Sequence, residues 1–200
     1  FVFDADPEII KFLREKGIAM ATLGGDNSVS YPIMRGLCRG APGKTLAIIH
    51  FDAHHDFRES HYGAMSSGVP YRLLLEEFPD QVKGECMTQI GISDFCNNPT
   101  LHAYADKKGV EVISNVETWE RGIRDVMNTA LERARGADML VTCGGASVGD
   151  HDLVQKVLGD IGLEIDFWRI AMRPGKPLMF GHIGDTRMLG LPGNPVSALV

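Results

Sequence analysis

Short apolar runs alternate along this chain with longer segments of helical period, and this alternation limits the possible folds more than any other feature of the sequence. A short, continuous apolar run bounded by turn residues is consistent with a strand buried on both faces. Strands that alternate with helices are typical of a mainly parallel sheet covered by helices. The sequence therefore predicts a three-layer α/β/α fold with a Rossmann-like sheet.

The expected elements follow from these runs. Strands are predicted at residues 18–23, 46–51, 87–92, 110–113 and 139–142. Helices are predicted at residues 7–16, 29–39, 70–78, 100–107 and 152–161. Further along, apolar runs at 167–172, 178–180 and 188–191 are separated by Gly and Pro turns, which predicts β-rich hairpins near the C-terminus.

A longer amphipathic helix is predicted from Glu117 to about Arg135. Its apolar residues, which include Trp119, recur at a spacing that places them on one face. Ser114 followed by Glu117 three positions later predicts a capping box at its start, and Gly136 predicts its end.

A polar cluster follows the apolar run at 46–51. Residues 50–56 read HFDAHHD, and in an extended chain every second side chain points the same way. Asp52, His54 and Asp56 are therefore expected on one face. Two carboxylates and an imidazole suit Mn²⁺ or a similar ion, which could lower the pKa of a bound water. A polar loop whose acids cap the next helix is the alternative.

A second turn, Gly24-Gly25-Asp26, follows the strand predicted at 18–23. Its glycines permit tight backbone turns, so that Asp26 can reach a neighbouring loop, although an ordinary helix N-cap is the alternative. In this order, the turn and the HFDAHHD segment resemble the ureohydrolase superfamily of arginase, agmatinase and formimidoylglutamase. The resemblance covers roughly residues 1–134.

This resemblance implies a C–N hydrolase in which two Mn²⁺ ions surround a hydroxide that attacks a guanidino or formimino carbon of a small-molecule substrate. It implies catalytic and metal-ligand roles for Asp52, His54 and Asp56, with Asp26 as a further ligand. Arg58, Ser67 and Gly68 look like substrate-binding positions of the formimidoylglutamase branch, where Arg58 could pair with a substrate carboxylate. A solvated surface arginine is the alternative for Arg58.

Two departures from the ureohydrolase pattern predict an incomplete metal centre. Asn27 stands where the family usually has histidine, and an amide is a poorer Mn²⁺ ligand than an imidazole. The family also supplies carboxylates from a later Ser-x-Asp-x-Asp-x-x-Asp-Pro strand end. In this chain the run at 139–142 continues instead into Cys143-Gly144-Gly145.

The C-terminal part contains three loops suited to binding anions. A glycine-rich turn, CGGASVGDHD, occupies residues 143–152, and RPGKP and GLPGNPVS follow at 173–177 and 190–197. Glycines let backbone N–H groups and a helix start face a phosphate, and the basic side chains of Arg173 and Lys176 suit oxyanions. Taken singly, these loops could equally be structural turns.

Taken together, the three loops resemble the molybdopterin molybdenumtransferases and the corresponding domain of gephyrin, over residues 137–200. The resemblance implies binding of adenylylated molybdopterin, with Mg²⁺ and molybdate as further cofactors, and a catalytic role for Asp152. The strand and Gly-Asp-Glu-Leu type loop that open this domain in the family are not present. The molybdopterin- or nucleotide-binding positions implied are Gly144, Gly145, Ser147, Gly149, Asp152, Arg173, Lys176 and Ser197.

We therefore interpret the chain as a chimera of segments 1–136 and 137–200 that share one sheet, joined between about residues 126 and 138. Because both motif sets are incomplete, a chimera without full activity is favoured. An active Mn²⁺-dependent amidine or guanidine hydrolase and a molybdenum insertase that binds adenylylated molybdopterin are the alternatives. Phe1 is no natural initiator, so the chain is expected to begin inside a larger protein.

Composition limits the partners. A net charge of −6, with 20 scattered Lys and Arg residues, argues against a nucleic-acid surface. No apolar run approaches the about 18 residues of a membrane span. The four cysteines form no CxxC pair, which fits a reducing cytoplasm. Small molecules and metal ions are the expected partners, and homo-oligomerisation stays open.

Overall fold

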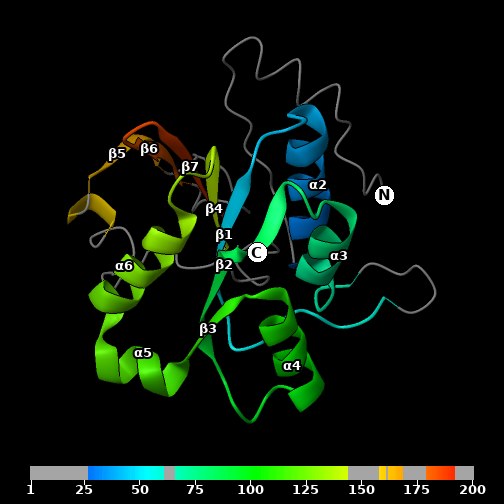
Figure 1. Cartoon of the computed structure of the whole chain (residues 1–200). Helices are drawn as coiled ribbons and strands as arrows, with labels where there is room; N and C mark the ends of the chain where they lie inside the picture. Colours follow the sequence, from blue (N-terminus) through cyan, green and yellow to red (C-terminus); the bar gives the residue numbers. More distant parts are fainter. Residues whose placement is uncertain (1–26, 61–65, 144–157, 161, 169–178, 192–200) are drawn as a thin grey trace, which may run out of the picture.

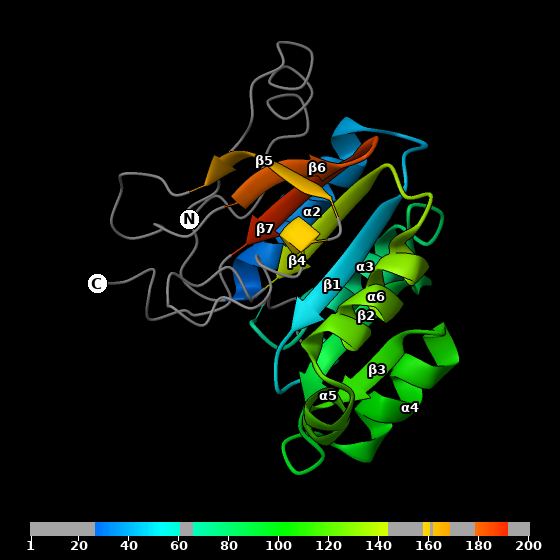
Figure 2. The ribbon, with the colours of Figure 1, turned by 90° about the vertical axis from the view of Figure 1, so that its left-hand side faces the viewer.

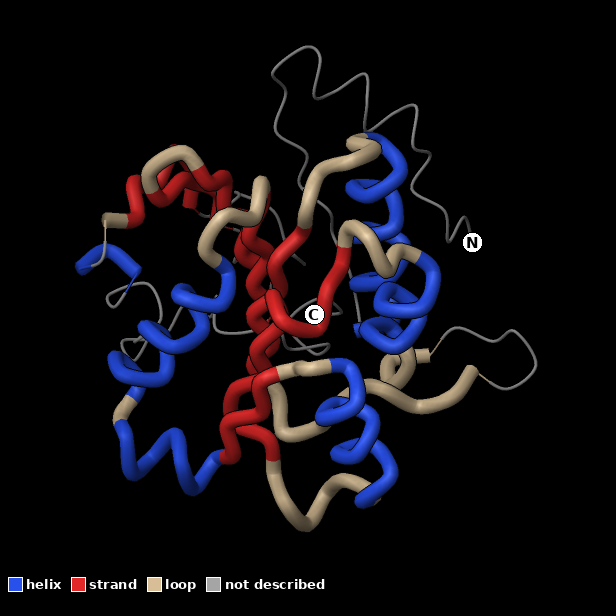
Figure 3. Tube along the Cα trace, in the orientation of Figure 1, coloured by secondary structure: helices blue, strands red, loops and turns tan. Residues whose placement is uncertain are grey.

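The computed structural model of the chain describes residues 27–60, 66–143, 158–160, 162–168 and 179–191. Helices cover both faces of a central sheet, so the three-layer α/β/α prediction is confirmed (Figures 1 and 3). The elements predicted at 7–16 and 18–23 lie outside the described residues. Among the residues described, no helix combines the length and apolar character that crossing a membrane requires.

The sheet has seven strands that run in the order β3-β2-β1-β4-β7-β6-β5 (Figure 2). Along this order, the pairs β3–β2, β2–β1, β1–β4 and β4–β7 are parallel. The pairs β7–β6 and β6–β5 are antiparallel. Both the mainly parallel sheet and the C-terminal hairpins are therefore confirmed. The strands are β1 Leu46–Phe51, β2 Val82–Ile92, β3 Glu111–Ser114, β4 Met139–Cys143, β5 Leu163–Trp168, β6 Met179–Ile183 and β7 Thr186–Leu191.

The helices are divided between the two faces of the sheet. One face packs against the first three α-helices and the other against the last two (Figure 3). A short 3₁₀ helix, η1, precedes the first of them. The bounds are η1 Asn27–Val29, α2 Ser30–Gly40, α3 Pro70–Glu77, α4 Pro99–Lys108, α5 Asn115–Arg121 and α6 Ile123–Ala134.

Each face of the sheet buries its own apolar cluster. Along β1 the side chains alternate, so Leu46 and Ile48 enter the cluster under α2, α3 and α4, whereas Ala47 and Ile49 enter the one under α6. Leu140 of β4 belongs to the second cluster. Strands from both sides of residue 136 thus fill the same cores, while the division at that residue stays a prediction.

The single helix predicted over residues 117–135 is wrong. Gly122 adopts φ 80° and ψ 149°, which ends α5 and starts α6, and its N–H donates to the Thr118 carbonyl. Glycine adopts positive φ at no steric cost, so the chain can turn there. As a result Trp119 is 89% exposed instead of lying on a buried face. The predicted start is confirmed, because Ser114 Oγ accepts from the Glu117 N–H at 3.1 Å.

We expect the substitution Leu140→Ala to destabilise both segments together. Leu140 is 1% exposed, and truncation of a buried leucine costs about 2–5 kcal/mol. Hydrogen exchange read separately in β2 and β7 should show protection lost in both strands. The control Phe95→Ala, at a fully exposed side chain, should leave protection unchanged. Loss confined to β7 would contradict a common core.

Candidate metal centre

The candidate site lies where β1 ends, at the carboxyl edge of the sheet. From β1 the chain continues to β2 on one side, and β4 later pairs with the other side. A strand end where the strand order reverses in this way is the usual binding crevice of open α/β sheets. In register, His50 of β1 lies between Gln89 of β2 and Cys143 of β4.

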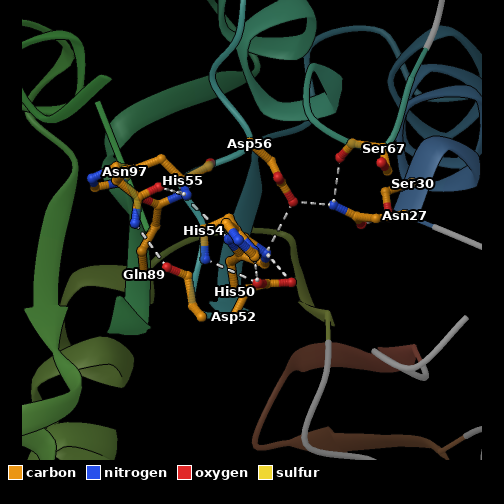
Figure 4. Close-up of polar contacts among 11 residues, drawn as sticks. Asn27, Ser30, His50, Asp52, His54, His55, Asp56, Ser67, Gln89 and Asn97 are labelled. Carbon is orange, nitrogen blue, oxygen red and sulfur yellow. Dashed lines mark hydrogen bonds and ion pairs between the residues drawn. The ribbon is translucent and has the colours of Figure 1, made fainter. Parts of the chain in front are cut away.

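Two carboxylates and one imidazole converge at this strand end (Figure 4). His50 Nε2 lies 3.7 Å from Asp52 Oδ2 and 3.7 Å from Asp56 Oδ2. One ligand atom from each of these three residues lies within 4.8 Å of the others. Asp52 and Asp56 were named from the sequence, but His50 was not, although its spacing of two residues from Asp52 was the available signal.

The backbone reaches this arrangement by a turn and not by an extended strand. Strand β1 ends at Phe51, residues 52–54 bend, and Asp56 adopts φ 54°, a conformation uncommon outside glycine. Alternation along an extended chain therefore does not explain the site beyond Phe51. The turn brings Asp56 back toward His50, at the same distance as Asp52.

His54, the predicted third ligand, contacts one of the carboxylates. Its Nδ1 lies 3.1 Å from Asp52 Oδ1, and its backbone N–H donates to the same oxygen at 2.9 Å. The side chain is about half exposed. His54 therefore borders the site from the solvent side, and its ligand role stays a prediction.

Two amide side chains that the sequence analysis did not name hold this turn in place. Asn97 Oδ1 accepts from the His55 N–H at 3.0 Å, and Asn97 Nδ2 donates to the Ala53 carbonyl at 2.8 Å. Gln89, fully buried on β2, bonds both the ring and the carbonyl of His55. Nothing in the sequence marks these residues, because the partners of Gln89 are set by strand pairing and those of Asn97 by the course of the loop after β2.

Burial and mutual charge separate the two acids. Burial would raise the pKa of Asp52, but its contacts with His50 and His54 lower that pKa to about 2. Burial and then the negative charge of Asp52 raise the pKa of Asp56 to about 7. Burial also lowers the pKa of His50. A cation between the carboxylates would stabilise both in their ionised form, and the donor set fits a divalent metal.

Asn27 contacts the site as a hydrogen-bond donor. Its Nδ2 donates to Asp56 Oδ2 and, at 3.2 Å, to the Ser67 carbonyl. Its Oδ1, the amide atom able to ligate a metal, accepts from Ser30 Oγ at 2.6 Å. Asn27 therefore orients Asp56 and has its oxygen turned to another partner.

The predicted substrate positions lie next to one another. The Arg58 N–H donates to the Gly68 carbonyl at 2.8 Å, and a Cβ added at Gly68 would come within 2.9 Å of Arg58 Cδ. Arg58 is exposed and lines a cavity of about 640 Å³ together with Arg72 and Lys107. Ser67 contributes its carbonyl to Asn27. Substrate binding by Arg58, Ser67 and Gly68 stays a prediction.

The remaining predicted site residues lie outside the described part of the chain. They are Asp26, Gly144, Gly145, Ser147, Gly149, Asp152, Arg173, Lys176 and Ser197. The strand beside β1 is described, however, and it ends in Thr142 and Cys143 without a carboxylate.

Known proteins match the chain in two parts. The model of the "Arginase family" matches residues 7–143, and that of the "Probable molybdopterin binding domain" matches residues 96–200. The chain therefore belongs to the arginase family over most of its length, and its C-terminal half belongs to the molybdopterin binding family. The two-part composition predicted from the sequence is confirmed. The matches overlap over 96–143, a range that includes α6 and β4.

Individual relatives agree with these two families. The chain is 38% identical to the formimidoylglutamase of Halalkalibacterium halodurans over 113 residues, which are 56% of this chain and 34% of that protein. It is 52% identical to the molybdopterin molybdenumtransferase of Haemophilus influenzae over 64 residues, 32% of this chain and 16% of that protein. The chain thus spans about a third of the first relative and a sixth of the second.

Solved structures resemble the arginase-family part. The formimidoylglutamase of Bacillus subtilis superposes with a TM-score of 0.60 at 28% identity, covering 70% of this chain and 44% of that one. A Trypanosoma cruzi formiminoglutamase determined with Mn²⁺ has a TM-score of 0.59 at 22% identity, covering 68% of this chain and 45% of that one. The second likeness shows the fold alone.

Proposed function

We propose that the chain binds one divalent cation, Mn²⁺ or a similar ion, between Asp52 and Asp56 at the end of β1, and that it lacks full hydrolase activity. The observation that carries this proposal is the convergence of Asp52 Oδ2 and Asp56 Oδ2 on one point beside His50. Two adjacent, partly buried carboxylates are the kind of ligands that Mn²⁺ and similar divalent ions prefer. In the bound state the ion would polarise a water molecule.

The residues of the chain have separate tasks in this proposal. Asp52 and Asp56 supply the negative charge, and His54 is the candidate imidazole ligand on the exposed side. Asn27 orients Asp56 through its amide N–H. Arg58, two residues after Asp56, would attract a substrate carboxylate.

The strand beside β1 supports the second half of the proposal. The residue of β4 in register with His50 is Cys143, and no acid lies among the residues of this strand. Two ions held close together need more anionic ligands than two aspartates can supply, since each added cation repels the other. Among the described residues, the site therefore offers carboxylates for a single ion and not for the pair of metals implied by the ureohydrolase resemblance.

Calorimetric titration of the metal-free chain with Mn²⁺ tests the site. We expect about one ion per chain, and a loss of affinity of at least about tenfold in Asp52→Asn and in Asp56→Asn, because each removes a charge next to the ion. Asp80→Asn, with the same charge change in the exposed turn before β2, should bind Mn²⁺ as the unmodified chain does. Equal affinity in all three variants would refute the site.

Turnover tests the lack of full activity. The Mn²⁺-loaded chain, incubated with a formimino amino acid, should release formamide at a small fraction of the rate of a full-length formimidoylglutamase assayed in parallel. The reason is that β4, the described strand beside β1, has no carboxylate that could hold a second ion. Turnover comparable to that of the full-length enzyme would overturn this part of the proposal.

A second candidate function is binding of adenylylated molybdopterin by residues 137–200. The observation that favours it is the 52% identity to a molybdopterin molybdenumtransferase over 64 residues. By that likeness, Ser147, Asp152 and Lys176 would contact the nucleotide, and Mg²⁺ and molybdate would be the further partners. The short span of the match argues for binding without metal insertion.

Binding of adenylylated molybdopterin should weaken when Ser147 or Lys176 is replaced by alanine. Each change removes a donor to a phosphate oxygen, and a charged hydrogen bond of this kind contributes about 1.5–3 kcal/mol. Equilibrium dialysis with the labelled compound would measure the loss. A Ser147→Ala variant that binds as tightly as the parent chain would count against this candidate.

A further inference from the structure

Gln89 is a fully buried amide that contacts two histidine rings, and one of them, His50, faces the carboxylates of the candidate metal centre. It lies on β2, in register with His50 of β1. Its Nε2 lies 2.7 Å from the His55 carbonyl oxygen and 3.2 Å from His50 Nδ1, and its Oε1 lies 2.6 Å from His55 Nδ1 (Figure 4). All three contacts are buried, so none is exchanged for water.

The carbonyl of His55 determines which way this amide points. A carbonyl oxygen only accepts hydrogen bonds, so the group 2.7 Å from it must be the amide NH₂ of Gln89. The Gln89 oxygen then faces His55 Nδ1, which must carry a proton in order to donate. A flipped amide would place two oxygens against each other in a buried site, at a cost of about 1–3 kcal/mol.

The same orientation determines the tautomer of His50. The second amide N–H of Gln89 points at His50 Nδ1, which must therefore be the unprotonated, accepting nitrogen. In a neutral imidazole the proton then lies on Nε2. That nitrogen faces Asp52 Oδ2 and Asp56 Oδ2, each at 3.7 Å.

We propose that Gln89 is a positioning residue of the metal centre: it holds His50 as the Nε2–H tautomer, so that His50 directs an N–H at both carboxylates and does not itself bind the metal. This inference rests on the metal site proposed above. A metal ligand must offer a lone pair, and the Nε2 lone pair of His50 is replaced by a proton in this tautomer. The two partly buried carboxylates are left as ligands.

This role has a consequence for the kind of cation bound. Carboxylate oxygens favour Mg²⁺, Mn²⁺ and Ca²⁺, whereas imidazole favours Zn²⁺ and similar ions. Removing His50 from the ligand set therefore shifts the preference of the site toward oxygen-loving ions. Gln89 acts in this way as a selectivity residue, although it does not touch the metal.

Nuclear magnetic resonance of the metal-free chain, labelled with ¹⁵N in its histidines, tests the tautomer directly. Protonated and unprotonated ring nitrogens have distinct ¹⁵N chemical shifts, and loss of one signal set in His50→Gln assigns the residue. We expect a protonated Nε2 and an unprotonated Nδ1 in His50, with the reverse in His55. A proton on His50 Nδ1 would overturn the inference.

Two variants separate positioning from a merely structural role. In Gln89→Glu an oxygen replaces the amide nitrogen, which costs stability because this oxygen faces the His55 carbonyl. The same oxygen would accept from His50 Nδ1–H, so the tautomer should invert and the affinity for Zn²⁺ relative to Mg²⁺ should rise about tenfold or more. Gln89→Leu removes the same hydrogen bonds and offers no acceptor to His50. Its affinity for Zn²⁺ relative to Mg²⁺ should therefore stay below that of Gln89→Glu. Equal ratios in the two variants would contradict the selectivity role.

The outcomes for Gln89 and for the metal site can be told apart. The tautomer is read without any metal, so it can be confirmed even if Mn²⁺ does not bind. Conversely, if Mn²⁺ binds but His50 is protonated at Nδ1, the proposed metal site stands and the proposed role of Gln89 is refuted. If Gln89→Glu does not fold, the spectrum of the unmodified chain still decides the question.

Discussion

Strand β1 is hydrogen-bonded along both edges, to β2 on one side and to β4 on the other, and both of its faces are buried. Its side chains alternate between the two apolar clusters, so β1 is the element on which both cores are built. Because all three strands are parallel, they end at the same edge of the sheet. Polar residues that follow β1 must therefore emerge between the ends of its neighbours, where Asp52 and Asp56 meet.

The same strand explains how parts of two families can form one sheet. Strand β4 pairs with β1 from Leu46 to His50, and the preceding turn is tied to the start of β1. Asp138 accepts from Lys44 Nζ at 2.7 Å and from the Thr45 N–H at 2.9 Å. The Lys44 contact and then the Thr45 N–H lower the pKa of Asp138 to about 2, so the link persists at neutral pH. Backbone pairing and this link are independent of which family β4 came from.

A structural feature can be predicted from the sequence when residues close together in the chain determine it, and not when it depends on residues far apart. Strand β1 was predicted at 46–51 and found there, because a short apolar run bounded by a polar loop is a local signal. The break at Gly122 was missed, since a glycine inside a helical pattern is often tolerated. Gln89 was missed for another reason. A polar residue in a buried strand is recognised as functional only when its partner on the next strand is known.

Packing and ligation place different demands on the strand beside β1. Packing requires only that Leu140 and Val141 of β4 be apolar and point to opposite faces of the sheet. Strands of many families satisfy this pattern. Metal binding by the end of β4 would require carboxylates at its last positions, where this chain has Thr142 and Cys143. A strand with this pattern can therefore complete the sheet and both cores whether or not its end carries metal ligands. The fold depends on the pattern of apolar residues, whereas metal binding depends on individual side chains.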